Sequence, residues 1–382
     1  MTQSEPAGQL RRSPLLPVHQ RLGATLTEFA GWQMPLRYGS EAAEHRAVRT
    51  AAGMFDLSHM GEIAVTGAGA PAALDYALAG QPSALAPGRA RYTMICAADG
   101  GVLDDLIVYR LSDAAFLVVA NAANNAVVHG ELSGRAAGFD AAVTDQTADY
   151  ALIAVQGPNA AAILAAVTDI DLAGVRYYAS QETVVCDRRI LLARTGYTGE
   201  DGFEMFCRAE DAEPLWAGLA AAGQEHGLVP AGLAARDTLR LEAGMPLYGN
   251  ELGPDVTPFD AGLGRVVKLD KPGDFVGRAA LAERAQQPPR RVLAGLACRG
   301  RRVPRHGFPV LWDGQPRGTV TSGAPSPTLG MPIAMAYLDP DVPGLAEAQA
   351  GRDAADTRLS IDIRGRGEAA DLVALPFYSR RR

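Results

Sequence analysis

The sequence predicts an α+β protein that ends in a small antiparallel β-domain. Its 382 residues are 48% hydrophobic and 21% charged, the balance of a globular chain with a large core. Alanine- and leucine-rich stretches of helical length alternate irregularly with short apolar runs through residues 1–284. From residue 291 to residue 382 only short alternating runs and turn signals follow. These observations predict two domains, 1–284 and 291–382.

The elements of the first domain follow from apolar periodicity between turn residues. Strands are expected at Gly61–Thr66, Val102–Leu111, Phe116–Ala120, Tyr150–Gln156, Val184–Arg194 and Gly202–Arg208. Helices are expected at Ser40–Ala52, Ala70–Leu78, Asn124–Ala137, Pro158–Val167, Ala212–His226 and Pro230–Ala243. The order is not a strict βαβ alternation, which favours α+β over α/β.

The second domain begins after a polar, proline-bearing linker, Ala285–Arg290. An Asp-Gly pair at 313–314 separates two short apolar runs, Val310–Trp312 and Gly318–Thr321, which is typical of a β-hairpin. We therefore expect residues 291–378 to form an antiparallel sheet, closed as a barrel.

Composition excludes several classes of function. The formal charge of −7 argues against a protein that binds nucleic acid over its whole surface. None of the four cysteines has zinc-ligand spacing, so no structural metal is expected. The sequence contains no run of about 18 apolar residues, so no membrane-spanning helix is expected. Met1–Ser13 lacks the apolar core of a signal peptide, so we expect a frayed N-terminal arm, and the simplest interpretation of the four cysteines is reduced thiols in a cytoplasm.

An acidic pair follows a two-glycine turn at the start of the Val102–Leu111 strand. Alternate residues of a strand share a face, so Asp105 lies with Ile107 and Tyr109, and Asp104 lies with Arg110. Asp105 is thus expected on the more apolar face, where a carboxylate is paired, protonated or used. The alternative is that both carboxylates sit in the turn and accept backbone N–H groups, and this segment alone favours that interpretation.

Two further candidates are charged residues of the Arg194–Glu204 loop and of the Pro230–Ala243 helix. Glu204 shares a strand face with Phe206. Its carboxylate either binds a planar ring that bears N–H donors or is a solvated strand residue. On the helix, Asp237 is expected to pair with Arg240, which leaves Arg236 as the better candidate for an anionic ligand.

A histidine, His59, stands in the segment Asp56-Leu57-Ser58-His59-Met60. It is either catalytic or structural. No Ser-x-Gly nucleophile elbow supports the catalytic interpretation, and a lone histidine is more often structural.

Taken together, these segments resemble the aminomethyltransferase family, the T-proteins of the glycine cleavage system. The resemblance covers about residues 15–379. The segments that carry it, in order, are Phe29–Leu36, Ala47–Met60, Gly100–Tyr109, Ile153–Pro158, Arg194–Glu204, Gly232–Gly244, Thr321–Gly330 and Pro376–Tyr378.

The resemblance implies a three-subdomain cloverleaf around a central folate pocket, with a C-terminal β-barrel. It implies transfer of the methylene group of an S-aminomethyl-dihydrolipoyl arm, carried by the H-protein, to tetrahydrofolate, with release of ammonia. The implied partners are the lipoylated H-protein and tetrahydrofolate as co-substrate, with no metal, nucleic acid or membrane.

The resemblance also implies roles for individual residues. Asp105 falls on the position near folate N5 and is the implied catalytic residue. Glu204 falls on the pterin-binding position and Arg236 on a ligand-contacting one. Further implied pocket positions are Tyr92, Asn121 and Tyr378. Alternatives of the same fold are a folate-dependent demethylase and a non-enzymatic folate-binding protein, although no cysteine here stands in the motif of the latter group.

Overall fold

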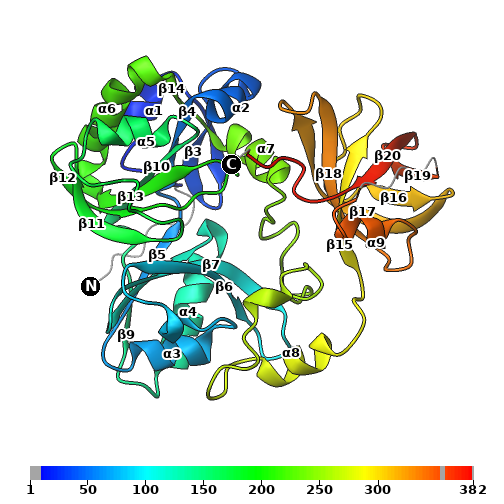
Figure 1. Cartoon of the computed structure of the whole chain (residues 1–382), viewed down its shortest axis with the longest axis horizontal. Helices are drawn as coiled ribbons and strands as arrows, with labels where there is room; N and C mark the ends of the chain where they lie inside the picture. Colours follow the sequence, from blue (N-terminus) through cyan, green and yellow to red (C-terminus); the bar gives the residue numbers. More distant parts are fainter. Residues whose placement is uncertain (1–9, 353–357, 381–382) are drawn as a thin grey trace. The chain divides into compact units, whose positions relative to one another are not determined.

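The computed structural model describes residues 10–352 and 358–380, which pack into two compact units (Figure 1). Each unit is assembled from separate stretches of the chain. The first unit comprises Met1–Glu62, Asp145–Gly196 and Asp201–Arg236, and the second comprises Ile63–Thr144, Tyr197–Glu200 and Asp237–Arg382. The residues before 284 are therefore divided between both units.

The first unit is organised by a six-stranded sheet in the order β11-β12-β13-β10-β4-β14. Neighbouring strands are antiparallel, except that β14 pairs with β4 in parallel. The strands are β4 (Ala52–Asp56), β10 (Tyr150–Gln156), β11 (Ser180–Val185), β12 (Arg188–Ala193), β13 (Gly202–Arg208) and β14 (Leu228–Pro230). A smaller sheet, β1-β3-β2, contains β1 (Arg11–Arg12), β2 (Thr25–Phe29) and β3 (Trp32–Arg37).

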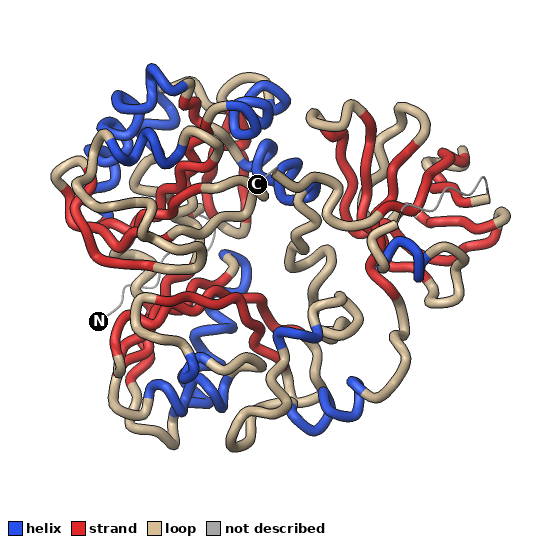
Figure 2. The backbone as a smooth tube through the Cα atoms, viewed as in Figure 1, coloured by secondary structure: helices blue, strands red, loops and turns tan. Residues whose placement is uncertain are grey.

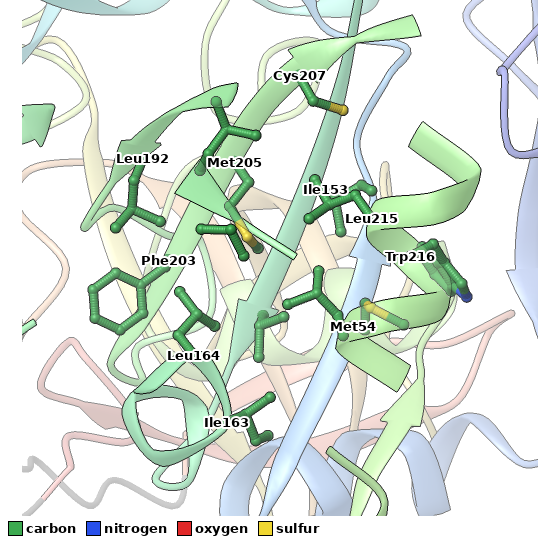
Figure 3. Close-up of a cluster of buried hydrophobic side chains, with 14 of the residues drawn as sticks. Met54, Ile153, Ile163, Leu164, Leu192, Phe203, Met205, Cys207, Leu215 and Trp216 are labelled. Atoms are coloured by element: carbon green, nitrogen blue, oxygen red, sulfur yellow. The ribbon is translucent and has the colours of Figure 1, made fainter. Parts of the chain in front are cut away.

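Helices cover one face of the six-stranded sheet, and the hydrophobic core lies between these helices and the sheet (Figure 3). Phe203 and Met205 of β13 and Ile153 of β10 belong to one buried cluster with Leu215 and Trp216 of α6 (Ala212–Gly223), and all five are at most 3% exposed. Burial of each large apolar side chain stabilises the fold by about 1.5–3 kcal/mol. The other helices placed in the first unit are α1 (Leu16–Arg21), α2 (Glu41–Thr50) and α5 (Ala160–Ala165).

The second unit contains a five-stranded sheet in the order β6-β7-β8-β5-β9. Its strands are β5 (Gly61–Thr66), β6 (Arg89–Cys96), β7 (Val102–Ser112), β8 (Ala115–Ala120) and β9 (Ala142–Asp145). Helices α3 (Ala70–Ala77) and α4 (Asn125–Ala136) pack on it around an apolar core. Short 3-10 helices are η1 (Pro82–Ala84), η2 (Ala122–Asn124) and η5 (Gly264–Val266) in this unit, and η3 (Ala209–Asp211) and η4 (Gln224–His226) in the first.

The C-terminal part of the second unit is a closed barrel in the order β15-β18-β17-β16-β19-β20, visible as a group of strands with one short helix beside them (Figure 2). The strands are β15 (Val292–Cys298), β16 (Pro309–Trp312), β17 (Gln315–Ser326), β18 (Met331–Leu338), β19 (Leu359–Asp362) and β20 (Gly367–Val373). The short helix is α9 (Leu345–Gln349), and α8 (Arg278–Ala285) precedes the linker. The predicted α+β class and C-terminal antiparallel barrel are confirmed.

The predicted hairpin of the barrel is also confirmed, because β16 and β17 pair around Asp313 and Gly314. Both turn residues have positive φ, 50° and 74°. This is the left-handed backbone that matches the twist of the flanking strands and that an Asp-Gly pair tolerates best.

Three predictions about local structure are wrong. Val184–Arg194 is not one strand but part of the β11–β12 hairpin, because Cys186 and Asp187 adopt φ of 49° and 60° and turn the chain. The helix expected from Pro230 begins at Leu233 as α7 (Leu233–Glu242), since Pro230 belongs to β14. Ser13 is not part of a frayed arm, because it is buried and donates a hydrogen bond to Asp56. The rest of the expected arm up to residue 9 lies outside the described residues.

Candidate functional site

Three of the predicted site residues meet on the five-stranded sheet of the second unit. Tyr92 lies on β6, Asp105 on β7 and Asn121 directly after β8. The Tyr92 hydroxyl donates to Asp105 Oδ2 at 3.0 Å, and Asn121 Nδ2 donates to Asp105 Oδ1 at 2.8 Å. Antiparallel pairing of β6 with β7 and of β7 with β8 brings these distant parts of the chain together. The Asp105 side chain is held at both oxygens and remains partly accessible.

Asp104 points the opposite way and is fully buried. It accepts hydrogen bonds from the Asn121 backbone N–H at 2.9 Å, from Asn121 Nδ2 at 2.9 Å and from Asn124 Nδ2 at 2.7 Å. Burial, and then the neighbouring charge of Asp105, raises the pKa of Asp104 to about 7. Burial also raises the pKa of Asp105, against the hydrogen bonds from Tyr92 and Asn121.

The structure corrects two expectations about this strand. The apolar face belongs to Asp104, whose neighbours Leu106 and Val108 lie in the core beneath α3 and α4. Strand parity separates the two faces but does not say which one the helices cover. Arg110 does not interact with Asp104 as expected. It pairs with Asp113 at 3.1 Å and donates to backbone carbonyls of η1 and of the residue after it.

Two residues near the acidic pair were missed by the sequence reasoning. Asn124, the last residue of η2, supplies the shortest hydrogen bond to Asp104. Its signal was the spacing of Asn121 and Asn124 just after a strand, since paired asparagines there commonly bond across a turn. Tyr248 lies close enough to the pair that, after burial, the charges of Asp104 and Asp105 raise the pKa of its hydroxyl.

Glu204 lies on β13 of the first unit and is buried, which rules out the solvated-strand alternative. The Thr195 hydroxyl donates to Glu204 Oε2, and Gln156 Nε2 donates to the Thr195 carbonyl at 3.1 Å. Gly196 and Gly202 press against the same glutamine, because a Cβ on them would lie only 2.0 and 2.4 Å from its side-chain atoms. These glycines are therefore required by close packing around the Gln156 side chain, whose amide bonds the residue that donates to Glu204.

Arg236 lies in the first turns of α7, near His59 of the same unit. Burial, followed by the Arg236 charge, lowers the pKa of His59 to about 4, so its imidazole is neutral near pH 7. A ring contact with Phe29 at 5.4 Å also fits the structural interpretation of His59. The predicted pairing of Asp237 with Arg240 is confirmed by a 2.8 Å bond from the Arg240 Nε.

Tyr378 belongs to the second unit and is held near the end of α7. Its backbone N–H donates to the Glu242 carbonyl at 2.8 Å. The Glu242 carboxylate in turn accepts from Ser326 Oγ at 2.5 Å and from Thr328 Oγ1 at 2.7 Å. The C-terminal segment is thus fixed to the loop between β17 and β18, which positions the half-buried Tyr378.

Two properties of the described residues bear on the class of site. Within residues 10–352 and 358–380, no group of three or more His, Cys, Asp or Glu side chains is arranged to hold a metal ion. None of the helices in those ranges has a stretch long and apolar enough to cross a bilayer. What the site does contain is an accessible, anchored carboxylate, which can accept a proton or stabilise a cation.

Comparison with known proteins decides the family. Residues 15–271 match the model of the GCVT N-terminal domain, and residues 291–379 match that of the glycine cleavage T-protein C-terminal barrel domain. The chain is 62% identical to the aminomethyltransferase of Saccharopolyspora erythraea over 97% of its length and 98% of the relative. The chain belongs to the aminomethyltransferase family of the glycine cleavage system.

Other aminomethyltransferases agree with this assignment. The protein of that name from Streptomyces coelicolor is 60% identical over 98% of this chain and 99% of its own. The crystal structure of glycine cleavage system aminomethyltransferase T from Bartonella henselae is 37% identical, with a TM-score of 0.88 over 97% of this chain and 99% of that one. The resemblance found in the sequence segments is therefore confirmed, and the chain is an enzyme, an aminomethyltransferase of the glycine cleavage system.

Proposed function

We propose that the chain transfers the methylene carbon of S-aminomethyl-dihydrolipoyl H-protein to tetrahydrofolate. The C–S and C–N bonds of the aminomethyl group both break; the sulfur leaves as the thiol of the dihydrolipoyl arm and the nitrogen leaves as ammonia. The carbon forms bonds to N5 and N10 of the folate, whose two protons leave with the thiol and with ammonia. The products are 5,10-methylenetetrahydrofolate, ammonia and dihydrolipoyl H-protein. The bacterial origin of the named relatives supports a bacterial cytoplasmic setting.

The observation that carries the proposal is the geometry of Asp105. Its two oxygens are bonded by the Tyr92 hydroxyl and the Asn121 amide, and the side chain is still partly accessible. A carboxylate fixed in this way stabilises a cationic aminomethyl or iminium carbon without reorganising, and it can take the N5 proton. Asp105 is the catalytic residue in this proposal.

Glu204 and Arg236 are the proposed folate-binding residues of the first unit. A pterin ring presents a 2-amino group and a ring N–H side by side, which a single carboxylate matches. The buried Glu204 carboxylate, which accepts from the Thr195 hydroxyl, has this chemistry. Arg236 is half-buried and carries the charge that an anionic carboxylate of the substrate requires. Tyr92, Asn121 and Tyr378 are further proposed ligand-contacting positions, which belong to the second unit.

Ammonia release from aminomethylated H-protein, with and without tetrahydrofolate, tests the reaction. We expect folate-dependent release by the native chain and a loss of about 100-fold or more in kcat for Asp105→Asn, because its charge is needed at the reacting carbon. Asp113→Asn, which changes an exposed carboxylate just after β7, is the control and should retain kcat. Full activity of Asp105→Asn would overturn the proposed role.

The same assay separates the alternatives of this fold. A folate-dependent demethylase would release no ammonia from aminomethylated H-protein but would consume an N-methyl substrate. A non-enzymatic folate-binding protein would bind folate without turnover. Either result in place of ammonia release would refute the proposed transfer.

Recognition of the protein carrier is a second part of the proposal. The arm is tethered, so binding energy from the H-protein should position it, and free S-aminomethyl-lipoamide should react with a much lower kcat/KM. Equal kcat/KM for the free and tethered substrates would contradict a role for the carrier.

A further inference from the structure

The buried carboxylate of Asp104 gathers three N–H donors from one short segment. Asn124 Nδ2 donates to Oδ1 at 2.7 Å, Asn121 Nδ2 donates to Oδ1 at 2.9 Å, and the Asn121 backbone N–H donates to Oδ2 at 2.9 Å. Both carboxylate oxygens are therefore used. Because Asp104 is fully buried, water does not compete for these bonds.

The Asn121 side chain links this buried carboxylate to the accessible one. Its Nδ2 lies 2.9 Å from Asp104 Oδ1 and 2.8 Å from Asp105 Oδ1. A primary amide has two N–H donors, so one N–H serves Asp104 and the other serves Asp105, whose backbone carbonyl also lies 3.2 Å from the same nitrogen. The orientation of the Asn121 amide is thereby set by Asp104, and its remaining donor sets the orientation of the Asp105 carboxylate.

A fully buried carboxylate beside a second carboxylate is costly unless both are supported. Asp104 does not reach the accessible side of the strand, so it does not touch a substrate bound at Asp105. A hydrophobic residue at position 104 would pack with the apolar core on that face at a lower cost in free energy. The arrangement is explained if the buried Asp104 carboxylate helps to position the accessible Asp105 carboxylate.

We propose that Asp104 and Asn124 are positioning residues for the transfer reaction, which hold the Asn121 amide so that it fixes the Asp105 carboxylate against Tyr92. This inference rests on the proposed role of Asp105. It assigns to η2 the task of fixing a catalytic carboxylate, and it explains why the asparagines at both ends of that helix point at the same aspartate.

The first test is the substitution Asp104→Asn. It leaves one acceptor oxygen where three N–H groups converge, so the Asn121 amide loses its support. We expect kcat for ammonia release to fall about 10- to 100-fold, because a small misplacement of a catalytic group has this effect. KM for tetrahydrofolate should change less than about threefold, since the proposed ligand contacts of Glu204 and Arg236 are unchanged.

The pH profile gives a readout that a merely structural role would not move. The other titratable groups that act on the pair are Tyr92 from β6 and Tyr248 from the segment after α7. The Asn121 hydrogen bond lowers the pKa of Asp105, so the pKa of Asp105 should rise when Asp104→Asn releases the Asn121 amide. We therefore expect the acid limb of the kcat profile of Asp104→Asn to shift to higher pH.

Two further variants complete the design. Asn124→Ala removes one donor but keeps the carboxylate and both Asn121 bonds, and it should lower kcat less than Asp104→Asn. Asn124→Ala also tests the positioning role if the Asp104→Asn variant does not fold. Asp75→Asn is the matched control, because Asp75 of the same unit accepts the Ser83 backbone N–H at 2.9 Å and has no role in the proposal. It should lower stability without altering kcat or its pH profile.

The outcomes separate this inference from the proposed function. A native chain that releases no ammonia, or a fully active Asp105→Asn variant, would refute the proposed function. An inactive Asp105→Asn variant, together with native kcat and pH profile in folded Asp104→Asn and Asn124→Ala, would refute the positioning role alone.

Discussion

His19 Nε2 lies 2.7 Å from Asp56 Oδ2, and both side chains are completely buried in the first unit. The carboxylate also accepts from Ser13 Oγ and from the Ser58 backbone N–H, while the Tyr38 hydroxyl lies 2.8 Å from His19 Nδ1. Burial raises the pKa of Asp56, but the hydrogen bond and charge of His19 and the two serine bonds hold it below its usual value. This network joins the start of the described chain to β4.

Breaking the pair should destabilise the first unit. We expect Asp56→Asn to lower the free energy of unfolding by about 3–5 kcal/mol, because it leaves His19 buried without its partner. Since the folded pKa of Asp56 is depressed, this stability is present above the unfolded pKa of about 3.9 and is lost as pH falls through the folded value. Urea unfolding at several pH values measures it. Exposed Asp169→Asn is the control, and equal stability of the two variants would contradict the prediction.

Glu62 should make the fold less stable as pH rises. It is fully buried, and neither carboxylate oxygen has a hydrogen-bond partner among the described residues. Burial, and then the charge of Asp145, raises its pKa well above the usual value, so the folded state keeps a proton that the unfolded chain loses above about pH 4.3.

Glu62→Gln removes this titration. Relative to the native chain, the variant should gain about 1.4 kcal/mol of stability for each pH unit between the unfolded and folded pKa values. Denaturant unfolding at pH 5, 6 and 7 measures the difference, with exposed Glu182→Gln as the control. A difference that does not change with pH would show that Glu62 is ionised in the folded protein.

Lys271 should stabilise the backbone around the end of α3, a role called here the Lys271 clamp. Its buried ammonium donates to the backbone carbonyls of Asp75, Leu78 and Gly80 at 2.5, 2.5 and 2.6 Å, around the end of α3. Lys271→Met leaves those carbonyls without their donor and should cost about 3 kcal/mol.

The matched control is Lys268→Met, because these are the two lysines of the sequence and Lys268 is half-buried. Thermal unfolding compares the variants, and amine labelling of the native chain followed by peptide mapping should modify Lys268 well before Lys271. Equal labelling of both lysines would contradict the clamp.

Folate binding should depend on the Glu204 cluster. A ligand that binds only the folded state raises its stability by about 2.7 kcal/mol at a concentration 100 times Kd. We expect 5-formyltetrahydrofolate to raise Tm of the native chain, Glu204→Gln to reduce this shift strongly and Thr195→Val to reduce it partly. Thermal shift titration measures all three, with exposed Glu182→Gln as the control. An unchanged shift in Glu204→Gln would remove Glu204 from the folate site.

Local sequence patterns predicted most elements of the fold. The strands β5, β10 and β13 have the predicted limits, and the Asp-Gly turn of the barrel was predicted because its backbone requirement is local. The β11–β12 hairpin was missed because Cys186 is not typical of left-handed backbone and no glycine follows Asp187 to mark the turn.

The candidate site was predicted differently. Parity along one strand put Asp104 and Asp105 on opposite faces, and the order of short segments identified the family. Strand parity and the order of segments depend only on the order of residues along the chain. They required no knowledge of which strands pair.

Tertiary structure alone decided which of the two aspartates is buried and what supports them. Helices α3 and α4 cover the Asp104 face, and pairing of β6, β7 and β8 brings Tyr92 and Asn121 to Asp105. It likewise gave Asp56 its partners from segments distant in the chain. The physical reason is that burial and hydrogen bonding depend on neighbours in space, whereas backbone propensity and side-chain alternation depend on neighbours in sequence.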